Sequence, residues 1–338
     1  MPHTHLRRLS SRLIPLILIG FGLTAPSAVW AEKTAASVME KLDKDGDGKI
    51  SRKEWRKKNI FNEVDLDNNG SVSLDELKQR FGEADNSTGQ RPDLPDPVSM
   101  AAIRRAKFDD VGHLKSRGLF ETDLKPVWPD DVSCRGIDEW YGKDYTPVRP
   151  KESYHGGIDI PAPFGTPVLA IMDGEVIALY EGKNNPRGIE VVLRHTPEES
   201  GLSLYLYSRY THFDHMPKLA IGQRVKMGDV LGETGNTGVQ GCELKGIPCR
   251  RPRRPVTHFD ILYSTNEKYY DTGSVLIPFE AHWMDPIALY RKQPPFDSFS
   301  MRALPEAEKK VAISYTLDSG ELFPADTRII WPYSCRKK

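Results

Sequence analysis

The chain has 338 residues, enough for two domains or for one large domain with appended segments. Its 47 basic and 47 acidic residues balance, so the composition lacks the basic excess expected of a nucleic-acid-binding protein. The four cysteines lie between positions 134 and 335, and their even number favours disulfides in an oxidising compartment.

The first thirty-one residues have the layout of a secretory signal peptide. Three arginines precede an apolar run over residues 13–23, and Val29 and Ala31 occupy the −3 and −1 positions of a cleavage site. The run is too short to span a bilayer, so a transmembrane anchor is the weaker interpretation. We therefore expect residues 1–31 to be removed, leaving a periplasmic or secreted protein of the cell envelope without a stable membrane span.

Residues 32–83 are charged, and they contain two twelve-residue loops at 43–54 and 65–76. Each loop has glycine at its sixth position and glutamate at its twelfth, as EF-hands do. A merely solvated acidic loop would not repeat these offsets twice. The predicted calcium ligands are Asp43, Asp45, Asp47, Lys49 and Glu54 in the first loop and Asp65, Asp67, Asn69, Ser71 and Glu76 in the second, with Lys49 and Ser71 at the backbone-carbonyl position.

The two loops are expected to form one EF-hand module. Ile50 and Val72 occupy the eighth position of each loop, where an apolar pair joins two such loops in a short β-contact. The loops start only 22 residues apart, a spacing similar to that of dockerin modules, but glutamate at the twelfth position favours the EF-hand. We expect calcium to be structural, with a regulatory switch and a protein partner as the alternatives.

Residues 84–130 are predicted to be a linker followed by an ambiguous helical segment. The stretch 84–99 is rich in proline, aspartate and serine and has no apolar period, which is typical of a linker. A short helix is expected over residues 100–108.

From residue 131 the pattern changes to short β-type runs separated by glycine and proline. Many short strands with turn signals between them indicate an antiparallel β-sandwich or barrel-like domain, predicted over residues 131–299. The chain is therefore expected to be mainly β and α+β overall. Residues 300–338 are predicted to be a C-terminal extension tied by a disulfide. The expected strands are 166–171, 175–180, 189–194, 202–208, 229–232, 258–263, 311–315 and 328–331.

A candidate metal site lies within this β-region. His155 and Asp159 are four residues apart, and His258 follows about a hundred residues later on an alternating strand. Imidazole and carboxylate groups suit Zn²⁺, and three protein ligands leave the fourth tetrahedral position open, as in catalytic zinc sites.

The stretch HGGIDIPAPFGTPVLAIMDGEVI, beginning at His155, resembles the first motif of the lysostaphin-type zinc endopeptidases that cut peptidoglycan peptides. The resemblance implies that His155, Asp159 and His258 hold zinc. It also implies, through the Tyr-x-His motif at residues 210–212, that His212 is the catalytic histidine beside the attacking oxygen. Asp260 takes the place of the family's glutamate and is expected to orient an imidazole.

One position departs from the family pattern. The family ends its last motif in His-x-His, whereas Val256 stands at the first of these places in this chain. In the family that histidine is an acid–base or supporting group, whose loss typically lowers rates by about 10²–10⁴-fold. His215 lies close to His212 in the sequence and is considered as a replacement.

An insertion separates Gly238 from His258 and contains two cysteines and a basic run over 250–254. Four cysteines allow three pairings, of which Cys242 with Cys249 and Cys134 with Cys335 are favoured. The basic run is expected to be solvated, with a groove wall for an anionic cell-wall polymer as the alternative.

The resemblance and the export signal together imply an exported zinc metalloendopeptidase that cleaves peptidoglycan cross-link peptides, and the loop motifs add calcium-binding EF-hands. Val256 supports an alternative, a catalytically impaired member of the same fold that binds the cell wall or activates another hydrolase.

Overall fold

The structure is a computed structural model that describes residues 34–55, 61, 64–65, 70–81, 94–104, 111–145, 153–182, 185–244 and 247–338. The predicted signal peptide and most of the predicted linker lie outside the described residues. Asp67 and Asn69, two of the predicted calcium ligands, also lie outside them.

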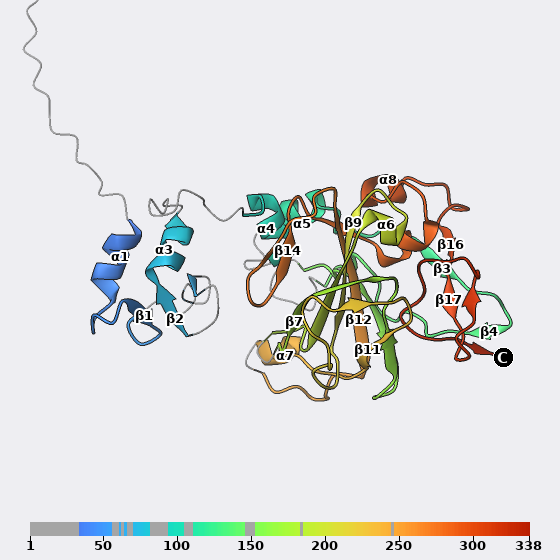
Figure 1. The fold of residues 1–338 in the computed structure, drawn as a ribbon, viewed down its shortest axis with the longest axis horizontal. Helices are drawn as coiled ribbons and strands as arrows, with labels where there is room; N and C mark the ends of the chain where they lie inside the picture. The colour runs from blue at the N-terminus through green and yellow to red at the C-terminus, as the bar shows by residue number, and fades with distance from the viewer. Residues whose placement is uncertain are drawn as a thin grey trace, which may run out of the picture.

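The described residues of the N-terminal unit form two helices and a two-stranded sheet (Figure 1): α1 (Ala35–Leu42), β1 (Lys49–Ser51), β2 (Ser71–Ser73) and α3 (Leu74–Phe81). Thr34 begins α1, because its side chain accepts a hydrogen bond from the Ser37 backbone, in a reciprocal capping box. The register pairs Ile50 with Val72, which confirms the predicted contact between the loops. Both side chains are fully buried in a small hydrophobic core of their own.

A seven-stranded antiparallel sheet forms the centre of the β-region (Figure 1). Its strands follow the order β10-β7-β8-β9-β12-β15, and β5 pairs with the first half of β12. Strand β8 is buried along nearly its whole length, because the core lies against it. The strands are β5 (Ile158–Pro161), β7 (Gly174–Tyr180), β8 (Glu190–His195), β9 (Tyr205–Thr211), β10 (Arg224–Val225), β12 (Val256–Ser264) and β15 (His282–Met284).

Shorter elements surround this sheet. Two-stranded sheets pair β3 (Lys125–Val127) with β16 (Lys310–Ala312), β4 (Val132–Ser133) with β19 (Arg336–Lys337), β6 (Pro167–Leu169) with β11 (Val230–Glu233), β13 (Tyr269–Asp271) with β14 (Leu276–Pro278), and β17 (Tyr315–Thr316) with β18 (Leu322–Phe323). The helices are α4 (Pro97–Arg104), α5 (Val111–Ser116), α6 (Pro197–Ser200), α7 (Gly241–Leu244), the 3-10 helix η2 (Pro286–Arg291) and α8 (Ser298–Arg302). The predicted mainly β fold, preceded by a small helical module, is confirmed.

Segments on both sides of residues 131–299 pack into the same hydrophobic core as the sheet. Ile103 and Leu119 contribute from the N-terminal side, and Trp331 and Tyr333 contribute from the C-terminal side. Residues 328–331 form no strand, and that prediction is wrong. Their backbone amides bond to separate segments, Ile330 to Ile171 and Trp331 to Ser314, so no ladder forms.

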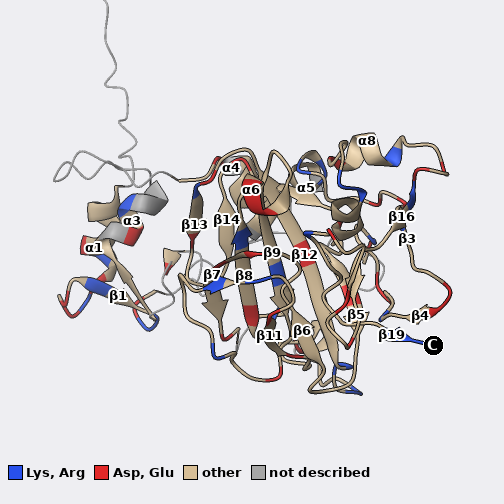
Figure 2. Cartoon of the chain, turned by 45° about the vertical axis from the view of Figure 1, so that its right-hand side comes forward, with Lys and Arg blue, Asp and Glu red and all other residues tan. Residues whose placement is uncertain are grey.

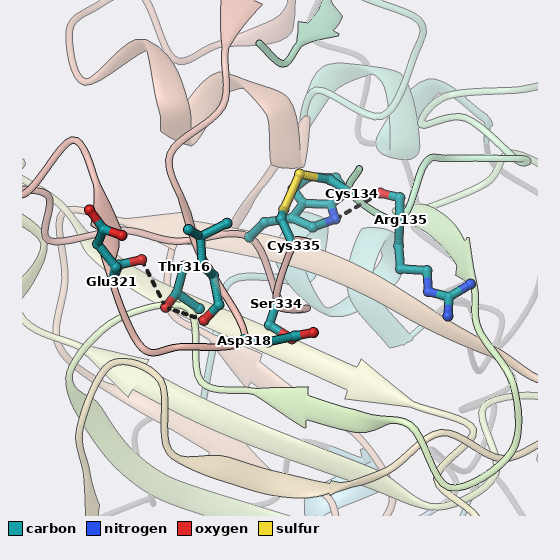
Figure 3. The surroundings of a disulfide bond; sticks show 9 residues. Cys134, Arg135, Thr316, Asp318, Glu321, Ser334 and Cys335 are labelled. Atoms are coloured by element: carbon teal, nitrogen blue, oxygen red, sulfur yellow. Dashed lines mark hydrogen bonds between the residues drawn. A yellow bond between two sulfur atoms is a disulfide. The ribbon is translucent and has the colours of Figure 1, made fainter. Parts of the chain in front are cut away.

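Both favoured disulfides are present, Cys134 with Cys335 and Cys242 with Cys249. Figure 3 shows Arg135 next to the first of them, and the carbonyl of Arg135 accepts a hydrogen bond from Trp331 Nε1 at 3.0 Å. The bond joins two segments 201 residues apart in the sequence, because β4 and β19 pair next to it.

Basic and acidic residues are interspersed along the elements in Figure 2, in keeping with the balanced composition. Within the described residues, no helix combines the length and the apolar character needed to cross a membrane.

Candidate metal centre

Asp159 and His258 come from neighbouring antiparallel strands. Asp159 lies in β5 and His258 in β12, and the register places the two residues directly opposite each other. Opposite side chains on one face of an antiparallel pair are close enough to interact. Asp159 Oδ1 and His258 Nδ1 are 2.9 Å apart, and both side chains are largely buried.

His155 completes the cluster from the segment that leads into β5. Its Nε2 lies 3.1 Å from Asp159 Oδ1 and 2.9 Å from His258 Nδ1. A neighbouring loop fixes its backbone, since His155 N donates to Lys143 O and Gly142 N donates to His155 O. The three predicted ligand atoms therefore meet at one point.

Gly157 makes this convergence sterically feasible. A Cβ atom at this position would lie 2.3 Å from the carbonyl oxygen of Phe259 and 2.6 Å from Cβ of Asp260. Real side chains do not tolerate such distances, so only glycine lets the His-x-x-x-Asp segment approach β12 this closely.

Hydrogen-bond partners determine which ring nitrogens carry protons. His155 Nδ1 lies 3.0 Å from the carbonyl oxygen of Trp140, which can only accept, so Nδ1 is the donor. His258 Nε2 lies 3.3 Å from the carboxylate of Asp260 and donates in the same way. Two ring lone pairs and one carboxylate oxygen thus converge, an arrangement that is repulsive unless a cation or a proton lies among them.

The three atoms fit zinc. Bonds of about 2.0–2.2 Å in a tetrahedral arrangement place neighbouring ligand atoms about 3.3–3.6 Å apart, somewhat more than the 2.9–3.1 Å separations in this cluster. Both imidazoles also donate their second nitrogen to an oxygen acceptor, which is how metal-ligating histidines are usually oriented. His155, Asp159 and His258 are therefore the residues that could hold the metal.

The pKa values of His258 and Asp159 reflect the negative charge of the carboxylates in the cluster. Burial alone would lower the pKa of His258, but hydrogen bonds to Asp159 and Asp260 outweigh it and raise the pKa to about 9. Burial would raise the pKa of Asp159, whereas hydrogen bonds from the two histidines hold it well below its usual value. A proton on His258 therefore provides positive charge that a bound cation would replace.

A buried ion pair between Arg209 and Asp260 holds the carboxylate that contacts His258 Nε2. Asp260 accepts two hydrogen bonds from Arg209, at 2.5 Å from Nε and 3.1 Å from Nη2. Burial would raise the pKa of Asp260, but the Arg209 charge and the His258 hydrogen bond lower it to about 2. Asp260 is therefore ionised, as an acceptor for the imidazole must be, and its predicted orienting role matches this geometry.

His212 follows the last residue of β9, and its ring lies 6.3 Å from that of His258 between centroids. Its Nδ1 lies 2.8 Å from the carbonyl oxygen of Thr237 and must donate to it, which leaves the lone pair on Nε2. Burial lowers the pKa of His212 to about 3, with help from the Arg253 and His258 charges, so the ring is neutral. A backbone φ of 67° is uncommon outside glycine and is typical of functional sites.

The basic run contributes two arginines to this centre. Arg253 Nη1 lies 3.4 Å from His212 Nε2. Arg254 forms two hydrogen bonds with Asp138, and its Nη2 also lies 3.1 Å from Asp159 Oδ2. The expectation that the whole run is solvated is therefore wrong for these two residues, because three carboxylates and a histidine surround them. Arg250 and Arg251 are exposed as expected.

The two residues linked with the departure from the family pattern lie in different surroundings. Val256 is fully buried and alternates to the same face of β12 as His258. The side chain of His215 is 82% exposed and lies 3.3 Å from Asp214. His215 thus points to solvent and does not replace the missing histidine.

The first EF-hand loop brings its acidic residues together. Asp43, Asp45 and Asp47 lie close enough to share one ion. Glu54 accepts hydrogen bonds from the backbone amides of Lys44 and Ser51 at 2.7 Å, which close the loop, and its pKa is lowered to about 2 by these and the Ser51 hydroxyl bond.

The second EF-hand loop repeats part of this arrangement. Ser73 bonds to Glu76 as Ser51 bonds to Glu54, through backbone and hydroxyl. Asp65 Oδ2 accepts from Gly70 N at 3.1 Å, and the backbone of Ser71 lies in β2.

Sequence reasoning missed four groups at the metal centre: the carbonyl of Trp140 and the side chains of Arg209, Arg253 and Arg254. A carbonyl has no sequence signal. The position of Arg253 and Arg254 immediately before the strand that carries His258 was a signal, since it limits how far the two side chains can lie from the site.

Residues 153–269 match peptidase family M23, and residues 35–60 and 57–81 match the EF-hand family. An uncharacterized metalloprotease of Buchnera aphidicola subsp. Baizongia pistaciae (strain Bp) is 31% identical over 137 residues, which are 40% of this chain and 32% of that protein. The chain thus spans about a third of the length of this relative.

Solved structures show similarity at lower identity. LytU is 24% identical and covers 45% of this chain and 87% of its own, with a TM-score of 0.31. The catalytic domain of lysostaphin from Staphylococcus simulans is 22% identical over 37% of this chain and 76% of its own, with a TM-score of 0.26. A zinc containing peptidase from Vibrio cholerae is 27% identical over 43% of this chain and 37% of its own, with a TM-score of 0.30.

The metal-ligand geometry lies inside the segment that matches family M23, and the paired loops lie inside the segment that matches the EF-hand. Residues 153–269 are therefore similar to peptidase family M23, and the segment that matches the EF-hand family lies ahead of them.

Proposed function

We propose that this chain is an exported zinc metalloendopeptidase that cleaves the cross-link peptides of peptidoglycan, with His155, Asp159 and His258 as the zinc ligands. The observation that carries the proposal is the convergence of two imidazole nitrogens and one carboxylate oxygen within 3.1 Å of one another. The predicted signal peptide and two disulfides support a cell-envelope location.

The site residues divide the work of hydrolysis. Zinc held by His155, Asp159 and His258 would supply Lewis acidity to polarise the scissile carbonyl and to lower the pKa of water. His212 presents an unprotonated Nε2, so it orients the attacking water by accepting a hydrogen bond and removes its proton. Asp260 holds the His258 ring through Nε2, which keeps Nδ1 directed at the ligand cluster.

His212→Asn is expected to lower the rate of muropeptide release by about 10²–10⁴-fold while zinc content stays unchanged. Asparagine tolerates the left-handed backbone at this position, so the fold is preserved. The mature chain and its variants would be incubated with peptidoglycan sacculi and the products separated by chromatography. His215→Ala is the matched control, because this nearby histidine is exposed. The control variant should release muropeptides at the wild-type rate.

The same assay tests the second candidate function, a cell-wall binding protein or hydrolase activator that has lost catalysis. Val256, buried where the family has a histidine, favours this candidate. This candidate would be established over the enzyme if the wild type and His212→Asn both bound stoichiometric zinc, bound sacculi equally well and released no product. A purified chain without zinc would contradict both.

We further propose that the EF-hand pair binds calcium for structural purposes. Glu54→Gln is expected to weaken calcium binding at the first loop by about tenfold or more, because the twelfth position supplies a charged bidentate ligand. Calcium should also raise the melting temperature of this variant less than that of the wild type. Calcium affinity is measured by calorimetric titration. Glu40→Gln is the control, because Glu40 is an exposed residue of α1. Equal calcium affinities in Glu54→Gln and Glu40→Gln would refute the assignment.

A further inference from the structure

The side chain of Arg253 reaches the reaction site from the insertion that precedes β12. Its Nη1 lies 3.4 Å from His212 Nε2, the atom that carries the lone pair. Its Nη2 donates to the backbone carbonyls of Pro186 and Val239, both at 3.3 Å. The guanidinium is therefore held in place by main-chain groups before any substrate arrives.

The backbone of Arg253 is anchored as well. Its carbonyl accepts a hydrogen bond from Asn236 Nδ2 at 3.1 Å, and Val256 N donates to Gly235 O at 3.0 Å. Arg254 next to it is fixed by Asp138 and Asp159. A disulfide between Cys242 and Cys249 closes the preceding part of the insertion. The segment thus presents Arg253 as a preorganised group.

The geometry points to Arg253 as the donor that stabilises the oxyanion formed during peptide hydrolysis. It would take the place of the histidine that the family has at the position of Val256. Val256 and His258 share one face of β12, so an imidazole at position 256 would project toward the site. The Arg253 guanidinium, three residues upstream of Val256, lies 3.4 Å from His212 Nε2. This inference rests on the proposed peptidase function.

The reaction needs such a donor. Attack of water on the scissile carbonyl forms a C–O bond and places negative charge on the carbonyl oxygen, while His212 takes the proton of the water. Collapse breaks the C–N bond, and the departing amine takes the proton from His212. A fixed guanidinium beside His212 Nε2 can donate Nη1–H to the charged oxygen without reorganising, which is the arrangement that stabilises transition states most strongly.

Arg253→Ala is expected to lower kcat on sacculi or released cross-linked muropeptides by about 10²–10³-fold with little change in KM, the loss expected for one oxyanion donor. Zinc content should stay at the wild-type level. Arg251→Ala, an exposed arginine of the same run, is the matched control and should behave like the wild type. The double variant Arg253→Ala with Val256→His is expected to regain much of the activity, because the new imidazole would offer a hydrogen-bond donor on the face of β12 that carries His258.

A binding measurement separates this inference from the proposed function. Phosphinate isosteres of Gly-Gly and Ala-Ala imitate the tetrahedral anion, and their affinity for zinc-loaded protein is expected to fall at least about tenfold in Arg253→Ala but not in Arg251→Ala. Wild-type protein that cuts nothing would overturn the proposed function, while the phosphinate affinities would still decide the role of Arg253. Equal affinities and rates in Arg253→Ala and Arg251→Ala would overturn the inference. Faster cleavage by Arg253→Ala than by the wild type would also overturn it and would identify Arg253 as a residue that blocks the site.

Discussion

Asp159→Asn is expected to abolish stoichiometric zinc binding and, with it, cleavage of peptidoglycan. Asp159 supplies the only carboxylate among the three converging ligand groups, and its Oδ1 lies within 3.1 Å of both imidazole nitrogens. An amide keeps the shape but removes the charge that balances the cation. Loss of a ligand should exceed the 10–100-fold loss of metal affinity that typically follows removal of an orienting partner.

Zinc content after dialysis and competition with a chromogenic chelator provide the measurement. Asp326→Asn is the control, because this aspartate is exposed and lies in the C-terminal segment. The near-ultraviolet circular dichroism spectrum should be unchanged in both variants, which shows that the β-region around the site remains folded. Wild-type zinc affinity in Asp159→Asn would show that the cluster does not hold the metal.

Asp260→Ala is expected to destabilise the protein by about 3–5 kcal/mol, because it leaves a buried guanidinium without its counter-charge. The Arg209 side chain is 2% exposed, and it stacks over the Trp283 ring at 5.1 Å. Among the described residues its Nη1 has no hydrogen-bond partner, so Asp260 provides its principal polar contacts.

Urea denaturation followed by near-ultraviolet circular dichroism, at fixed zinc and calcium concentrations, measures this loss. The matched control is Asp318→Ala, which removes the exposed ion pair with Arg336 and should cost at most about 1 kcal/mol. The double variant Arg209→Met with Asp260→Leu should recover most of the lost stability, because it removes both charges together. Equal midpoints for Asp260→Ala and Asp318→Ala would contradict the assigned role of the buried pair.

Local sequence patterns predicted the parts of this protein whose chemistry depends on neighbours along the chain. The EF-hand loops depend on fixed offsets within twelve residues, and the pairing of Ile50 with Val72 follows from equivalent positions in two copies of one motif. Alternation within β12 predicted that Asp260 lies on the same face as His258. Both disulfide pairings were also anticipated.

The His-x-x-x-Asp motif and its distant histidine were visible in the sequence by type, order and flanking residues. Their meeting at one point depends on the register that sets Asp159 opposite His258, and on Gly157, which permits the close approach of the two backbones. Register between segments a hundred residues apart follows from the packing of the whole sheet, so no local pattern contains it.

The sequence by itself determined the EF-hand motifs and the mainly β character, because each depends on residue types at short, fixed spacings, and it predicted the candidate metal ligands by residue type and order. Only the tertiary structure decided that Arg253 and Arg254 are part of the centre, that His215 is not, and that residues outside 131–299 complete the core. A long side chain such as arginine reaches several ångströms in many directions, and its partners are chosen by the three-dimensional placement of acceptors rather than by its position in the chain.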